Sequence, residues 1–263
     1  MKNRISISIK TLFVFAFAFL MVDRLSAQEF KLAKSSGRLE IIEVNKVTVE
    51  GYNGNEIVFS SRDFSKEKDK RAEGLKAVSS MGLEDNTGLG LSVVDKGTSI
   101  EVRQLKKMDG PEVKIMVPKG VIVSFTHSSP YGSGVNFKNV ESEIEISTVH
   151  NSVHLENVTG PMTINTVHGE INVDFNGGIK APVSIASVHG PVDVTLPSAT
   201  KATLSMSTTY GEVYVDPAIK LEIEKKDDKW VTFGSGKVSG KMNGGGLEIS
   251  LTSTHNNIYL RKK

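Results

Sequence analysis

The chain has 263 residues, of which 38% are hydrophobic and none is cysteine, and its charge is nearly balanced, with 32 Lys and Arg against 30 Asp and Glu. Without cysteine a disulfide framework and thiol chemistry are excluded, so stability has to come from buried apolar area and backbone hydrogen bonds. Aromatic residues make up only 6% of the chain and no basic face is visible. This composition argues against binding to nucleic acid.

The N-terminus has the three-part pattern of a secretory signal peptide. Three basic residues open it, namely Lys2, Arg4 and Lys10. An apolar stretch at 11–22 follows, and a polar break leads to Leu25, Ser26 and Ala27. We predict a signal peptide over residues 1–27, because the apolar stretch is short of the roughly 20 residues that a membrane-spanning helix needs. A retained anchor is the alternative. We therefore expect an exported protein of the periplasm, cell surface or extracellular space, with no stable membrane span after cleavage.

Residues 28–134 show the period-two alternation of β-strands. Predicted strands lie at 38–44, 46–50, 56–60, 89–94, 99–105, 112–117 and 121–125. Gly and Pro separate them, since Gly adopts positive φ at little cost and Pro ends a strand ladder. The charged stretch at 62–73 is predicted to be an exposed loop with a helical turn as an option. We expect these residues to form an N-terminal β region.

Residues 135–263 are dominated by a repeat. Five segments align without gaps, at 144–155, 162–173, 183–194, 204–215 and 249–260. Each has apolar residues at alternate positions on two arms, joined by Ser or Thr, then Val or Thr, then His or Tyr, then Gly or Asn. The central residues are His150, His168, His189, Tyr210 and His255. An insertion at 221–246 contains a strand-like stretch at 230–233, and Val121 and Val123 before His127 resemble a degenerate earlier copy.

The alternation in each unit predicts two strands with one apolar face each, joined at Gly or Asn because those residues best tolerate left-handed backbone angles. A single unit has no partner for its apolar face, whereas stacked copies bury a shared core. The predicted fold is therefore all-β, a repeat β-solenoid like a single-stranded β-helix, with the N-terminal strands stacking on it or flanking it. A sandwich of antiparallel hairpins is the competing architecture.

Three motifs together resemble those of the bacterial putative-adhesin β-strand-repeat family. They are the Thr-Val-His-Gly-x-Ile unit at 166–171 with its copies, the pair 71–75 and 85–93, and the ending from 243–246 through 256–260. Members of that family often carry Asn or Asp before the turn Gly, where this chain mostly has His. The resemblance implies an envelope-associated β-repeat scaffold.

Two sets of side chains are candidates for chemistry. If the repeats stack in register, His150, His168 and His189 form a row with about 4.8 Å between strands, and His154 is near in sequence. Such a row could share a transition metal, but it lacks the mixed Cys/His cluster typical of zinc sites, so we interpret it as stacked turn residues. The second set consists of carboxylates, which a glycosidase would need as a close pair. They are Glu141, Glu143, Glu145, Glu170, Asp193 and Glu212.

We assign no catalytic, metal or cofactor residue from the sequence, because no nucleophile motif, phosphate loop or dinucleotide fingerprint is present. The leading hypothesis is a non-catalytic exported or envelope β-repeat protein that acts as a binding surface or scaffold, with a protein or polysaccharide of the cell envelope as partner. The alternatives are a carbohydrate-active enzyme on a β-helix and a self-assembling structural element of the envelope.

Overall fold

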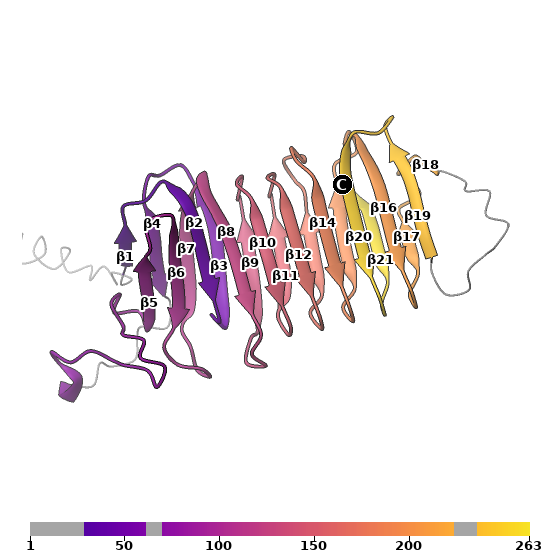
Figure 1. The fold of residues 1–263 in the computed structure, drawn as a ribbon. Helices are drawn as coiled ribbons and strands as arrows, with labels where there is room; N and C mark the ends of the chain where they lie inside the picture. The colour runs from indigo at the N-terminus through magenta and orange to yellow at the C-terminus, as the bar shows by residue number, and fades with distance from the viewer. Residues whose placement is uncertain (1–28, 62–69, 224–235) are drawn as a thin grey trace, which may run out of the picture.

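The computed structural model describes residues 29–61, 70–223 and 236–263, and within them the protein is nearly all-β. Two sheets of ten and eleven strands face each other in a long, flat stack (Figure 1). The β-solenoid predicted from the repeat is therefore confirmed. In these ranges no helix is long and apolar enough to cross a membrane. The predicted signal peptide and the strand-like stretch at 230–233 lie outside the described residues.

Each repeat contributes one strand to either sheet. The first arms in the eleven-stranded sheet are β10 (Ile144–Thr148), β12 (Met162–Thr166), β14 (Val183–Ser187), β16 (Ala202–Thr208) and β20 (Leu247–Ser253). The second arms in the ten-stranded sheet are β11 (Ser152–Glu156), β13 (Ile171–Asp174), β15 (Val192–Leu196), β17 (Val213–Val215) and β21 (Ile258–Lys262). Neighbouring repeats pair in parallel and in register, as in β10 with β12 and β11 with β13. Parallel stacking excludes the antiparallel sandwich.

The order of the repeats in space differs from their order in the chain. The last repeat, β20 and β21, lies between the repeat of β14 and β15 and that of β16 and β17. The outer side of β16 is occupied by β19 (Gly236–Met242), which pairs with it antiparallel and carries β18 (Leu221–Ile223) beyond it. The chain therefore passes around β16 before its final repeat enters the stack.

The N-terminal strands continue both sheets. They are β1 (Glu29–Leu32), β2 (Ser36–Ile42), β3 (Lys46–Tyr52), β4 (Ile57–Ser61), β5 (Leu91–Asp95), β6 (Ser99–Gln104), β7 (Glu112–Pro118), β8 (Gly120–His127) and β9 (Gly134–Lys138). The strand β8 pairs with β10 on one side and with β2 on the other. A 3-10 helix at Lys70–Ala72 confirms a helical turn in the charged loop; residues 62–69 of that loop are outside the described ranges.

The core lies between the two sheets and follows the alternation read from the sequence. In the first repeat Ile144 and Ile146 of β10 and Val153 and Leu155 of β11 are buried, while their neighbours face outward. The same apolar cluster extends from the N-terminal strands to the last repeat. Alternate burial on parallel strands explains why one consensus is repeated along the chain.

The turn glycines serve close packing between repeats, so the explanation by left-handed backbone angles is wrong. Gly169, Gly190 and Gly211 are absent from the described residues with positive φ. A Cβ at Gly169 would lie 1.8 Å from the carbonyl oxygen of Asn151 in the preceding repeat, and a Cβ at Gly190 would lie 2.0 Å from the carbonyl oxygen of Gly169. Glycine suits these two positions because successive turns touch backbone to backbone, whereas Asn256 holds the equivalent position of the last repeat and its side-chain amide donates to the His189 carbonyl oxygen at 3.1 Å.

The Ser or Thr of the consensus is buried and holds the turn together. The Ser187 hydroxyl oxygen accepts a hydrogen bond from the Gly190 amide at 2.9 Å, and the Thr208 hydroxyl does the same for Gly211 at 2.9 Å. Thr166 links neighbouring repeats, since its hydroxyl lies 2.9 Å from the Gly169 carbonyl oxygen and 3.1 Å from the Ser187 hydroxyl. The row of buried hydroxyls therefore satisfies backbone groups that the turn leaves without a ladder partner.

His127 occupies this buried position rather than the exposed turn position. Register pairs His127 with Thr148, so the degenerate copy begins at Val123, two residues later than the sequence alignment places it. The His127 side chain is buried, its Nε2 donates to Asn45 Oδ1 at 3.0 Å, and its Nδ1 has no hydrogen-bond partner among the described residues. Burial lowers the pKa of His127. An imidazole here replaces the hydroxyl that the later repeats use.

Candidate functional site

The predicted histidine row is present along one edge of the solenoid. The ring centroids of His150 and His168 are 5.2 Å apart, and those of His168 and His189 are 4.9 Å apart, with the ring planes within 15° and 6° of parallel. His255 stacks on His189 at 4.7 Å and Tyr210 on His255 at 4.9 Å. This exposed row, the histidine edge, follows the spatial order of the repeats. The turns that carry it, such as the one between β10 and β11, lie at the bottom of Figure 1.

The ring geometry favours stacking over shared metal coordination. An imidazole nitrogen binds a metal in the plane of its ring, at about 2.0–2.1 Å for zinc. Nearly parallel planes about 5 Å apart do not meet at such a point. His154 lies on the outer face of the ten-stranded sheet instead, 3.3 Å from the Asn172 amide and 3.8 Å from the Glu170 carboxylate. Across the described ranges no three His, Asp or Glu side chains form a group that could hold a metal ion.

The carboxylates of the first repeat are divided among separate contacts. Glu145 forms an ion pair with Arg38, and the hydrogen bond within this pair lowers the pKa of Glu145. Glu141 is hydrogen-bonded to Lys119 at 2.8 Å, and this bond lowers the pKa of Glu141. Lowered pKa values keep both groups ionised at neutral pH, which is unsuitable for a general acid. Glu143 remains at one end of a surface groove.

The carboxylates of the later repeats also have structural partners. Asp193 accepts a two-point hydrogen bond from Arg261, at 2.8 Å from Nε and 2.8 Å from Nη2. Glu212 accepts from the Tyr214 hydroxyl. Glu170 lies beside His154 at 3.8 Å. The structure thus brings none of these three together with the carboxylates of the first repeat.

The outer face of the eleven-stranded sheet carries rows of small hydroxyl side chains. Register places Thr163, Ser184, Ser250 and Ser205 opposite one another on four neighbouring strands, β12, β14, β20 and β16. A second row, nearer the histidine edge, contains Ser147, Asn165, Ala186, Thr252 and Ser207. Because parallel strands are about 4.8 Å apart, the first row repeats a hydroxyl at that spacing on four strands, whereas Ala186 interrupts the second row. We call this surface the hydroxyl face.

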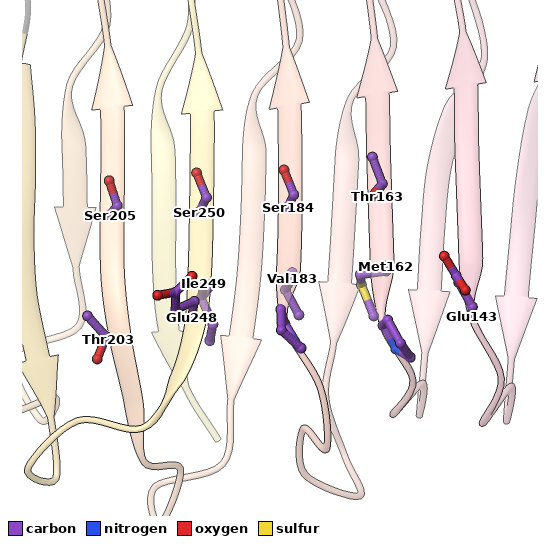
Figure 2. A pocket seen from close by; sticks show the side chains of 12 residues that line it. Glu143, Met162, Thr163, Val183, Ser184, Thr203, Ser205, Glu248, Ile249 and Ser250 are labelled. Carbon is purple, nitrogen blue, oxygen red and sulfur yellow. The ribbon is translucent and has the colours of Figure 1, made fainter.

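A groove of about 500 Å³ crosses the hydroxyl face perpendicular to the strands. Figure 2 shows the hydroxyls of Thr163, Ser184, Ser250 and Ser205 at one level across it, with Glu143 at one end and Glu248 toward the other. Its remaining outward lining comes from Pro161, Pro182 and Thr203. A second, smaller hollow continues along the same face toward β8 and shares Thr163 with the first. The arrangement offers hydroxyl donors and acceptors to an extended ligand lying along the solenoid.

Sequence reasoning missed this groove, although its components were visible. The outward positions of the repeat hold Thr163, Ser184, Ser205 and Ser250 at the same place in each copy. The neighbours of each hydroxyl, however, depend on the spatial order of the repeats. Ser250 adjoins Ser184 only because the last repeat lies in space between the repeat of β14 and that of β16.

The chain belongs to the Toastrack DUF4097 family, whose model matches residues 6–261. No curated protein matches it. Among solved structures it is similar to that of a "putative cell adhesion protein" from Clostridium sporogenes ATCC 15579, with 13% identity, a TM-score of 0.44 and coverage of 90% of this chain and 100% of that chain. It is also similar to that of a "putative adhesin" from Bacteroides fragilis NCTC 9343, with 10% identity, a TM-score of 0.37 and coverage of 89% and 96%.

Proposed function

We propose that this protein is a non-catalytic, exported scaffold of the cell envelope that binds an extended polysaccharide along its hydroxyl face. The observation that carries the proposal is the groove of about 500 Å³, which crosses neighbouring repeats and is lined by at least one hydroxyl from each of four strands. A repeating ligand and a repeating protein surface suit each other, because each unit of the ligand meets the same side chains on the next repeat.

The chemistry of the groove supports a polyhydroxylated ligand. Ser and Thr hydroxyls both donate and accept hydrogen bonds, so they exchange water for sugar hydroxyls without leaving a group unpaired. Glu143 and Glu248 add acceptors that bind hydroxyl donors through charge-assisted hydrogen bonds. Pro161 and Pro182 provide flat apolar surface between them.

The two acids of the groove are too far apart to act as a glycosidase pair. Register puts Glu143 and Glu248 at the same level, with Pro161 and Pro182 between them, directly before β12 and β14. Three strand spacings put them about 14 Å apart. Glycosidases need about 5–5.5 Å for retention or about 6.5–9.5 Å for inversion. This supports binding rather than cleavage at the groove.

Affinity electrophoresis in gels containing single purified envelope polysaccharides tests the proposal. We expect at least one polysaccharide to retard the protein. The double variant Ser184→Arg/Ser250→Arg fills the groove and should weaken that binding about tenfold or more, which is about 1.4 kcal/mol. The matched control is Asn172→Arg, which adds the same side chain to the outer face of the ten-stranded sheet.

The outcomes separate the hypotheses. Retardation lost in the groove variant and kept in the Asn172→Arg control supports the proposal. No retardation by any polysaccharide, or equal loss in both variants, refutes it. Release of sugar products during the same incubations would refute the non-catalytic assignment.

A further inference from the structure

The two sheets end at different places at the C-terminal end of the stack. In the described chain the ten-stranded sheet has no strand beyond β17, which belongs to the same repeat as β16. The eleven-stranded sheet continues past β16 with β19 and then β18, so it extends two strands further (Figure 1). We call this end the two-strand step. It consists of β17 on one side and of β18 and β19 on the other.

The two-strand step leaves part of the core uncovered. Register places Leu221, Ile223 and Val238 on the inner side of the eleven-stranded sheet, in line with the buried positions of β16. Ile223 is 59% exposed, and Leu221 and Val238 are half-buried. On β17 the inward Val213 and Val215 are also half-buried, whereas the corresponding positions of β15 are fully buried. Another layer of strands is missing from this end.

The free side of β17 has backbone groups that point to the step. The Asp216 amide donates to the Leu260 carbonyl oxygen of β21 at 2.9 Å. In a parallel ladder, successive residues of a strand point their amides and carbonyls to opposite sides. The amides and carbonyls of Val213 and Val215 therefore point away from β21, where the described chain has no strand to pair with them.

The free side of β18 follows from the same alternation. The Leu247 amide donates to the carbonyl oxygen of Lys201, directly before β16, so odd-numbered residues of β16 point to β20 and even-numbered ones to β19. In the antiparallel pairs that follow, even-numbered residues of β19 point back to β16 and odd-numbered ones point to β18. Leu221 and Ile223 lie opposite even-numbered residues, so their amides and carbonyls point away from β19.

The opposite end of the solenoid is protected. The Asn86 side chain occupies the amide and the carbonyl of Val93 on the outer side of β5, at 2.9 and 2.7 Å. The last strand of the other sheet, β1, carries the charged residues Glu29 and Lys31. Covers and charges of this kind keep strand edges from pairing with another chain. The two-strand step is therefore the end that is suited to an added strand.

We propose that the two-strand step is the contact surface of a symmetric dimer, in which β17 of each copy pairs antiparallel with β18 of the other. A two-fold axis parallel to the strands sets the eleven-stranded sheet of one copy in the layer of the ten-stranded sheet of the other. The two extra strands of each copy then fill the two empty places of its partner. A two-fold axis normal to the sheets would set β18 against β18 and leave β17 unpaired. A two-fold contact closes after two copies.

Backbone direction and side-chain direction agree in this pairing. β17 begins at the histidine edge and β18 runs toward it, so the two strands meet antiparallel. Val213 then lies opposite the partner's Ile223, and Val215 lies opposite the partner's Leu221. These pairs join backbone groups that point outward from both sheets, and they keep all four side chains on the core side. Each ladder gains about four hydrogen bonds, and the exposed apolar face is buried.

The charge of the step suits a second copy of the same chain. A self-complementary contact needs balanced charge, because both sides carry the same residues. The pairing sets Lys220 opposite the partner's Asp216, and Glu222 opposite the partner's Tyr214. The charged residues of 212–223 and 236–242 are three lysines and three acids, namely Lys220, Lys237, Lys241, Glu212, Asp216 and Glu222.

Sedimentation velocity of the mature protein over a hundred-fold range of concentration tests the dimer. We expect a monomer–dimer equilibrium without larger species. Ile223→Lys places an unpaired charge within the apolar contact and should raise the dissociation constant of the dimer at least ten-fold. The matched control is Val94→Lys on β5, which adds the same side chain at the other end, at a position that is 44% exposed, and should leave the equilibrium unchanged.

Disulfide trapping tests the register, and the absence of native cysteine makes the assay clean. In Tyr214→Cys/Glu222→Cys the two cysteines of one copy lie on different sheets, but each faces a cysteine of the partner across a Cα distance of about 4.5 Å. A disulfide spans that distance, so oxidation should give a covalent dimer. In the control Tyr214→Cys/Lys241→Cys the second cysteine lies one strand further, at about 9 Å, and should not be trapped.

The outcomes decide between a second copy and other occupants. A concentration-dependent dimer that Ile223→Lys weakens, with trapping only in Tyr214→Cys/Glu222→Cys, supports the inference. A wild-type monomer at every concentration refutes it and leaves the step to another occupant, such as residues 224–235 of the chain itself or a strand of a different protein. Filaments, or equal trapping in both cysteine variants, also refute it. The polysaccharide assay uses other variants and does not need the dimer, so the two proposals fail independently.

Discussion

Replacement of Gly169 by Ala tests the packing of one turn on the next. The added Cβ would lie 1.8 Å from the Asn151 carbonyl oxygen and 2.5 Å from the Asn151 carbonyl carbon, whereas real Cβ atoms essentially never approach within 3.0 Å. Relieving the contact with the oxygen requires the two turns to separate by about 1.2 Å. The hydrogen bond from the His168 amide to the Val149 carbonyl, now 2.8 Å, would then exceed the length of a hydrogen bond.

The cost follows from the bonds that this separation breaks. The hydrogen bond from the Val167 amide to the Thr148 carbonyl oxygen, 3.1 Å long, joins the same two turns and should weaken together with the bond from the His168 amide. Two or three lost hydrogen bonds at about 1 kcal/mol each, with strain from overpacking, give a loss of about 2–4 kcal/mol in the free energy of unfolding. Urea denaturation followed by far-ultraviolet circular dichroism measures this loss as a lower midpoint.

Two further variants make this prediction refutable. At Gly134 in β9 an added Cβ would meet its nearest atom, the Ser152 carbonyl oxygen, at 3.6 Å, so Gly134→Ala should change stability by less than about 0.5 kcal/mol. Gly169→Asn separates the two explanations of the turn, because Asn tolerates left-handed angles but carries the same Cβ. A midpoint for Gly169→Ala equal to that of Gly134→Ala, or wild-type stability of Gly169→Asn, would show that close approach is not the reason for glycine.

Three other variants probe individual polar side chains. The pKa of His127 is lowered in the folded state, so the unfolded chain binds a proton at this imidazole first as pH falls through about 6.5. Acid should therefore lower the stability of the wild type more than that of His127→Thr. Melting temperatures at pH 7.5 and 5.0 measure the difference. Ser187→Ala leaves the buried Gly190 amide without its 2.9 Å acceptor and should cost about 1–3 kcal/mol in urea denaturation, and wild-type stability would contradict the role of the buried hydroxyls. The Asn86 side chain pairs with both backbone groups of Val93 at 2.7 and 2.9 Å, covering the edge of β5, so Asn86→Ala should raise aggregation measured by light scattering; unchanged scattering would show that this edge is protected in another way.

The location of the strands could be read from the sequence because it depends on local pattern. Alternating burial requires alternating apolar residues, and the predicted strands at 38–44, 46–50 and 112–117 correspond to β2, β3 and β7. The stacked row of His150, His168 and His189 was also predictable, since equal positions in parallel repeats must align when the strands pair in register.

The groove, the spatial order of the repeats and the reason for the turn glycines depended on the tertiary structure. The five copies share one consensus, so local sequence allows any copy to pair with any other. The antiparallel pairing of β19 with the outer side of β16 leaves the opposite side of β16 for β20, and this choice puts Ser250 beside Ser184 and His255 beside His189. Alternation along one strand determined which residues are buried, but contacts between strands distant in the chain determined which residues meet, because those contacts depend on the strand edges left open by the rest of the fold.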